Sequence, residues 1–162
     1  MADEIHVTVA KVEKPNGRFP GKLDDKGRLK LPVSLQEYLK SFGEQKFFIT
    51  SLDRYLAQIY TMPTWRQNEK FFAEFTDDPE VAENIKFNAD DLGADAEMDS
   101  QGRITFNTDL RRELGLEGQD LHLFAHEGRV EVYSEAAYQA RKLRAQQNPG
   151  SNVTALKSKG LK

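Results

Sequence analysis

The chain has 162 residues, of which 38% are hydrophobic and 30% charged, and its formal net charge is −3. This length suits one domain or two small ones, and no apolar run approaches the roughly 18 residues that a membrane-spanning helix needs. Cysteine is absent, which excludes disulfides, thiolate metal sites and cysteine nucleophiles and indicates a cytoplasmic, reducing environment.

Charge is unevenly distributed along the chain. Residues 66–100 contain eleven acidic and three basic side chains, whereas residues 136–162 contain six basic and no acidic ones. An acidic middle and a basic end predict two surfaces of opposite sign.

Residues 1–17 form an N-terminal extension. Ile5, Val7 and Val9 alternate with polar residues, and "KPNG" follows as a turn. This pattern predicts an additional edge strand. The extension has no continuous apolar run, so it does not resemble a signal peptide.

One short motif occurs twice. "LDDKGRLKLPVSL" at residues 23–35 returns as "MDSQGRITFNTDL" at residues 98–110. In both copies an apolar alternation of period two predicts a strand, and helical spacing of leucines follows. The identical positions are Asp24 and Asp99, Gly27 and Gly102, Arg28 and Arg103, and Leu35 and Leu110.

The repeat continues beyond the motif. "QKFFITSLDRYLAQIYTMPTW" can be aligned with "QDLHLFAHEGRVEVYSEAAY", so that Trp65 corresponds to Tyr138. Each half therefore predicts strand, tight turn, strand, short helix, strand, turn and strand. We expect a first repeat over residues 18–61 and a second over residues 93–134, produced by duplication.

Helices are predicted between and after the repeats. Residues 62–92 form a helical connection in which Asp78 caps a helix that starts at Pro79. Aromatic residues along its first part predict a packing surface rather than a binding site. A C-terminal helix over residues 135–147 precedes a polar, basic tail at 148–162, which we expect to be disordered.

Patterns for metal binding and catalysis are weak. His122 and His126 lie four apart in a strand that runs into a turn, with no third ligand evident. The acidic stretch before Ser100 lacks the glycine and glutamate of a calcium loop. No glycine-rich phosphate loop or nucleophile elbow occurs, so we predict no catalytic residue, metal, cofactor or small-molecule substrate, and no enzyme.

Two interpretations remain open for the repeated arginine. Arg28 and Arg103 each follow a glycine, at a turn where the backbone can approach another surface. Each guanidinium could form a buried pair with the turn aspartate, Asp24 or Asp99, whose carboxylate we expect to accept backbone N–H groups. Alternatively, it could contact phosphate or the edge of guanine.

The two copies differ in charge. Lys22, Lys26 and Lys30 surround the first copy, whereas Gln101 and Thr105 stand where Lys26 and Lys30 stand. We therefore expect the first copy to contribute more to binding an anion.

At these residues the chain resembles the MraZ family, the tandem member of the SpoVT/AbrB superfamily. "DDKGRLKLP" and "DSQGRI", each followed by a helix, carry the resemblance, which covers roughly residues 19–143. In the second copy Asn107 replaces the proline of the motif. The resemblance implies an α+β, β-rich fold: a swapped-hairpin β-barrel formed by two repeats as an intrachain pseudo-dimer.

The resemblance also implies a function. It predicts a nucleoid-associated transcriptional regulator that forms a ring-shaped homo-oligomer. The oligomer would bind short direct repeats in double-stranded promoter DNA upstream of division and cell-wall genes. The turn arginine is implied as the binding residue, here Arg28 and Arg103. Two alternatives stay open: an antitoxin-like regulator with a toxin partner, and an interaction scaffold without DNA binding. The basic tail could bind phosphate or only aid solubility.

Overall fold

The two halves of the chain fold into the same series of elements. The computed structural model describes residues 12–162, so the predicted edge strand at Ile5–Val9 lies outside the described residues. The first half consists of β1 (Arg18–Gly21), β2 (Arg28–Lys30), α1 (Val33–Lys40), β3 (Lys46–Thr50) and β4 (Ala57–Thr61). The second half consists of β5 (Ala94–Glu97), β6 (Arg103–Thr105), α4 (Thr108–Glu113), β7 (Leu121–His126) and β8 (Arg129–Tyr133). The predicted order of elements and the α+β class are confirmed.

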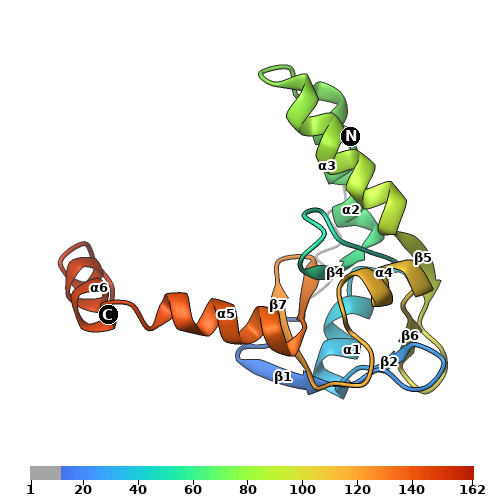
Figure 1. Ribbon diagram of the computed structural model, residues 1–162, viewed down its shortest axis with the longest axis horizontal. Helices are drawn as coiled ribbons and strands as arrows, with labels where there is room; N and C mark the ends of the chain where they lie inside the picture. Colours follow the sequence, from blue (N-terminus) through green and yellow to red (C-terminus); the bar gives the residue numbers. More distant parts are fainter. Residues whose placement is uncertain (1–11) are drawn as a thin grey trace, which may run out of the picture.

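Four further helices follow the two halves. A hairpin of α2 (Met62–Glu74) and α3 (Pro79–Leu92) leaves the strands in one direction, whereas α5 (Glu135–Ala145) and α6 (Pro149–Lys157) extend in another (Figure 1). Asp78 caps α3 by accepting a hydrogen bond from the N–H of Val81, as predicted. Asn107 caps α4 in the same way, through the N–H of Leu110.

The strands of the two halves are exchanged. All pairs are antiparallel, and the six-stranded sheet has the order β1-β7-β8-β4-β3-β5, while β2 and β6 form a separate two-stranded ribbon. β1 of the first half pairs with β7 of the second, and β5 of the second half pairs with β3 of the first. The first strand of each half therefore completes the sheet of the other half.

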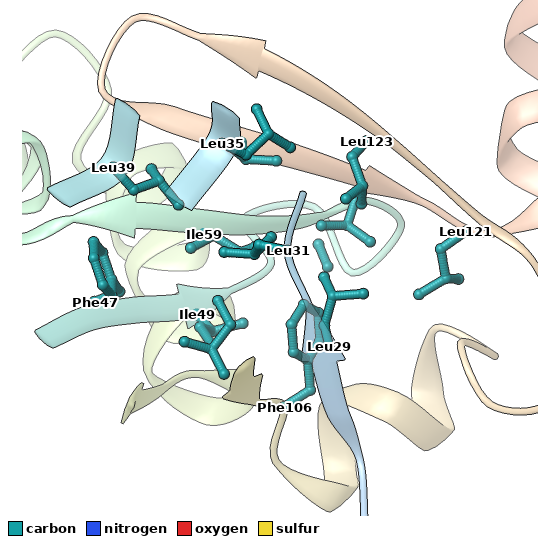
Figure 2. Packing of buried hydrophobic residues seen from close by; sticks show 14 of the residues in the cluster. Leu29, Leu31, Leu35, Leu39, Phe47, Ile49, Ile59, Phe106, Leu121 and Leu123 are labelled. Carbon is teal, nitrogen blue, oxygen red and sulfur yellow. The ribbon is translucent and has the colours of Figure 1, made fainter. Parts of the chain in front are cut away.

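A single apolar core serves both halves. Leu29, Leu31 and Phe47 of the first half and Phe106 and Leu123 of the second are fully buried in one cluster (Figure 2). Burying each such side chain contributes about 1.5–3 kcal/mol. Since the cluster is shared, separating the halves would expose it.

A second, smaller cluster lies beneath the helical hairpin. Trp65 of α2 lies 4.6 Å from Phe48 and 5.0 Å from Tyr60, measured between ring centroids. Ala89 of α3 is fully buried against these rings, and Phe72 packs at the edge. The predicted packing role of the aromatic residues on α2 is confirmed for Trp65 and Phe72.

The C-terminal segment differs from the disordered tail expected from the sequence. Pro149–Lys157 form α6, which buries no residue. Pro149 provides a favourable first residue, and Ala155, Leu156 and Lys157 are good helix formers. The good helix formers are thus confined to the last turn, and the helix forms without burying any residue.

Candidate nucleic-acid interface

Both glycine-arginine motifs adopt one turn geometry. The Oδ1 atom of Asp24 accepts hydrogen bonds from the N–H groups of Lys26 and Arg28, both at 2.9 Å. Gly27 has φ +77°, a value that favours glycine, and its N–H donates to the carbonyl of Asp24. Asp24 therefore fixes the backbone of the first turn through three hydrogen bonds, two to its carboxylate and one to its carbonyl.

In the second turn Asp99 takes the place of Asp24. Its Oδ1 atom accepts from the N–H groups of Gln101 and Arg103 at 2.9 Å, and Gly102 also has φ +77°. The predicted role of the aspartate as an acceptor for its own turn is confirmed in both copies.

The two arginines pair with the turn aspartates at the surface. Arg28 donates from Nε to Oδ2 of Asp24 at 2.7 Å, and Arg103 donates from Nε to Oδ2 of Asp99 at 2.8 Å. Their side chains keep 29% and 25% of their surface exposed. Within residues 12–162, the terminal Nη1 and Nη2 groups of both arginines make no hydrogen bond. The aspartate thus orients each guanidinium while leaving its outer edge available to an acceptor.

The aspartates are strongly acidic because of these contacts. The pKa of Asp24 is lowered to about 2, first by the N–H of Arg28 and then by its guanidinium and the N–H of Lys26. The N–H and guanidinium of Arg103 lower the pKa of Asp99 in the same way. Both carboxylates are therefore ionised at neutral pH, so each arginine keeps its orienting partner.

Strand pairing brings the two arginines to one face. In the β2–β6 ribbon, Arg28 lies opposite Thr105, Leu29 opposite Ile104, and Lys30 opposite Arg103. Leu29 and Ile104 are buried, and side chains alternate along a strand, so the arginines, Lys30 and Thr105 share the outer face. We call these four residues the ribbon face: Arg28, Lys30, Arg103 and Thr105.

Lys30 lies in a different place from the one expected. The sequence associates it with the first turn, but the register places it directly across from Arg103 of the second. Lys26 is exposed at the tip of the first turn, and Lys22 is exposed just after β1. The two halves therefore share the basic side chains more evenly than the sequence predicts.

Comparison with known proteins supports the family resemblance that the repeated motif indicates. The family model described as "MraZ protein, putative antitoxin-like" matches residues 93–157. Transcriptional regulator MraZ of Acidobacterium capsulatum is 31% identical over 122 residues, which cover 75% of this chain and 83% of the relative. The protein of the same name in Thermomicrobium roseum is 32% identical over 77% of this chain and 84% of the relative.

The chain belongs to the MraZ family. A more distant relative, Transcriptional regulator MraZ of Desulfitobacterium hafniense, is 29% identical but covers 90% of this chain and 98% of its own length. The match thus includes both halves. These relatives are named as transcriptional regulators, which confirms the prediction that this MraZ family member is no enzyme.

Each turn of this MraZ chain is supported by the opposite half. The carbonyl of Gly27 accepts a hydrogen bond from the N–H of Phe106 at 2.8 Å, and that of Gly102 accepts from Leu31 at 3.0 Å. A Cβ atom on Gly27 would overlap the guanidinium of Arg111 on α4. Position 27 therefore needs glycine for two reasons: its φ is positive, and a Cβ atom would not fit beside Arg111.

Arg111 supports the first turn although it lies just outside the repeated motif, so the motif did not predict its role. Its side chain is only 13% exposed, donates to Glu117 at 3.0 Å and to Thr108 at 2.9 Å, and packs against Gly27. At the corresponding position in the first half, Gln36 packs against Gly102. The repeat offset of 75 residues relates these two positions, so the alignment contained a signal for this pair.

Candidate metal ligands are used in other contacts. His122 contacts Arg18 through Nδ1 at 2.9 Å and Glu135 through Nε2 at 2.7 Å. His126 pairs with Glu131 at 3.1 Å. In the described part of the chain, no three His, Cys, Asp or Glu side chains gather in a way that could hold a metal ion. Likewise, no helix over residues 12–162 is long and apolar enough to cross a membrane.

Proposed function

We propose that this chain is a DNA-binding transcriptional regulator and that the ribbon face contacts promoter DNA. The observation that carries the proposal is the arrangement of the two arginines on one exposed face, each oriented by an aspartate through Nε alone. A two-stranded β-ribbon fits the major groove, and a guanidinium edge matches phosphate oxygens or the O6 and N7 atoms of guanine.

Electrostatics of the ribbon support an anionic partner. Lys30 and Arg103 lie directly across from each other, and like charges at opposed positions destabilise a strand pair. An anion placed between them removes this repulsion. Five bases and three carboxylates gather at the ribbon and its turns, so the region is positive although the chain as a whole is negative. They are Lys22, Lys26, Arg28, Lys30, Arg103, Asp24, Asp25 and Asp99.

The exchanged strands support a more specific fold. We propose that the two repeats form a swapped-hairpin β-barrel as an intrachain pseudo-dimer. The two exchanged pairings are nearly equivalent: Phe19 of β1 pairs with Leu123, and Ala94 of β5, 75 positions after Phe19, pairs with Ile49, 74 positions before Leu123. The β2–β6 pair and the β4–β8 pair join equivalent strands of the two halves.

We further propose that the protein acts at the nucleoid as a ring-shaped homo-oligomer. Its targets would be short direct repeats upstream of division and cell-wall genes, as the family resemblance implies. One ribbon offers few contacts, and a ring presents several ribbons at once. Once one ribbon is bound, the next binds at a high effective concentration, so weak contacts combine into firm binding.

A gel shift with the DNA upstream of the protein's own gene tests DNA binding. We expect Arg28→Ala to weaken binding about tenfold or more, and Arg103→Ala to weaken it less, because Lys22 and Lys26 flank only the first turn. Lys70→Ala removes one exposed charge from α2, away from the ribbon, and serves as the matched control. Unchanged affinity in the Arg28→Ala/Arg103→Ala double variant, with an unchanged circular dichroism spectrum, would refute the proposal.

A further inference from the structure

The second half has a groove where the first half has a helix. In the first half, α3 covers the aromatic cluster of Tyr60 and Trp65. The hydroxyl of Thr50 holds α3 in place by donating a hydrogen bond to the carbonyl of Ala89 at 2.7 Å. Strand register and helix position identify the counterparts in the second half. Tyr60 corresponds to Tyr133, and Trp65 corresponds to Tyr138, since each is the fourth residue of its helix.

The corresponding surface beside α5 is hollow. It forms a groove of about 340 Å³, which we call the α5 groove. The residues that line it include Phe124, Tyr133, Tyr138, Arg141, Lys142 and Ala145. Phe124 and Tyr133 pack edge to face, with 5.3 Å between their ring centroids. The helix that follows α5 does not cover the groove, because α6 extends away and buries no residue (Figure 1).

Charge indicates what kind of helix fits the α5 groove. Arg141 and Lys142 form no ion pair with any residue of the described chain, although Lys142 lies 6.0 Å from the ring of Tyr138. The chain's own tail is basic, with Lys157, Lys159 and Lys162, so it would be repelled. The groove therefore suits an occupant that is acidic and aromatic.

The α2–α3 hairpin has this chemistry. Phe71 is 57% exposed and lies 5.4 Å from Phe75, and both line a hollow at the hairpin end together with Glu74 and Asp77. Residues 62–92 contain eight acidic and three basic side chains. Neither Glu74 nor Asp77 is part of an ion pair among residues 12–162.

We infer that the α5 groove of one copy binds the end of the α2–α3 hairpin of a second copy. Phe71 and Phe75 would pack on the groove aromatics, while Glu74 and Asp77 would pair with Arg141 and Lys142. The hairpin and α5 leave the strands in different directions, so the contact joins separate copies (Figure 1). This inference rests on the proposed oligomer and identifies the surfaces that would form it.

The two surfaces differ, so the contact is head to tail. After one contact forms, the first copy still has its hairpin free and the second still has its groove free, so further copies can add at both ends. Copies joined in this way add one after another, each rotated relative to the last, and the assembly closes into a ring when these rotations complete a full turn. An interface made from one surface used twice would stop at a dimer.

Charge reversal in the full chain tests this pairing by light scattering after size exclusion, without DNA. We expect both Arg141→Glu/Lys142→Glu and Glu74→Lys/Asp77→Lys to lose assembly at concentrations at which the unaltered chain assembles. Mixing the two variants should restore it, because the acidic groove of one meets the basic hairpin of the other, and the reverse contact is also complementary. Circular dichroism checks that both variants fold.

Lys157→Glu/Lys159→Glu changes the charge by the same amount on α6 and should leave assembly intact. Assembly by either reversed variant alone, or no recovery on mixing, would overturn the inference. Loss of assembly on deleting residues 148–162 would also overturn it, by indicating α6 as the occupant. A monomeric unaltered chain would contradict this inference and the proposed ring, whereas DNA contact by the ribbon is judged separately from the affinities of the arginine variants.

Discussion

Arg111, on a helix of the second half, packs its guanidinium against Gly27 in the turn of the first half. The contact spans 84 residues of sequence and joins the helix that follows one arginine motif to the turn that forms the other. Gln36 makes the reciprocal contact with Gly102. Each candidate binding turn is thus held by the half to which it does not belong.

This contact predicts an unusually costly glycine substitution. Gly27→Ala combines a left-handed backbone, φ +77°, with overlap between the new Cβ and Arg111. We expect the free energy of unfolding in urea to fall by about 2–4 kcal/mol. Gly118→Ala is the matched control, since Gly118 has φ +70° but no atom near its Cβ position, and it should lose about 1 kcal/mol. Equal losses would show that Arg111 does not constrain the turn.

The orientation of Arg28 predicts that lysine cannot replace it. Arg28 uses Nε for Asp24 and has two further nitrogens for a ligand, whereas a lysine has a single ammonium group. Arg28→Lys should weaken DNA binding while leaving the dependence of affinity on salt nearly unchanged. Arg28→Ala should weaken binding and also reduce the magnitude of the salt slope by about 1. Full binding by Arg28→Lys would mean that only charge matters at this position.

Asp24 predicts a loss of stability in acid. Its pKa is about 2 in the folded chain and 3.8 when unperturbed, so its ionised form stabilises the fold above pH 4. That contribution declines as the pH falls from 4 towards 2, because the unfolded chain binds the proton first. Asp24→Asn should be less stable than the unaltered chain at neutral pH, and the difference should shrink below pH 4. A difference that stays constant from pH 7 to pH 2 would contradict this role.

Arg54 holds the helical hairpin to the strands through its ion pairs. It has φ +60° and donates to Glu113 through two nitrogens, at 2.6 and 3.0 Å, and to Asp91 at 2.7 Å. These contacts join the β3–β4 loop to α3 and α4. Arg54→Gln should therefore speed hydrogen exchange in α3 while protection of the central strands stays unchanged. Arg66→Gln, which removes a pair with Glu44 instead, is the control and should leave α3 protected.

Features set by neighbouring residues could be predicted from the sequence. The turn geometry of Asp24 and Asp99, the cap at Asp78, and the order of elements depend on short stretches of chain. The arginine pairing was foreseen as one of two alternatives, although it lies at the surface rather than in the interior.

Features that depend on long-range pairing could not be predicted. A register across β2 and β6 places Lys30 opposite Arg103, and no local pattern reveals it. The contact of Arg111 with Gly27 has the same origin, because α4 lies beside that turn only through the pairing of β6 with β2 of the other half. The polar composition of residues 148–162 predicted disorder, whereas Pro149–Lys157 form α6.

The difference between Gln36 and Arg111 gives the ribbon a direction. Two identical interlocked units would be related by a twofold axis. A protein with that symmetry would bind a DNA duplex equally well in either orientation. Joining the units in one chain removes the requirement that they be identical, so one corner could keep a glutamine while the other has an arginine. The DNA contact proposed for the ribbon face would then be directional, which suits the direct repeats proposed as targets, since these have a direction that a palindrome lacks.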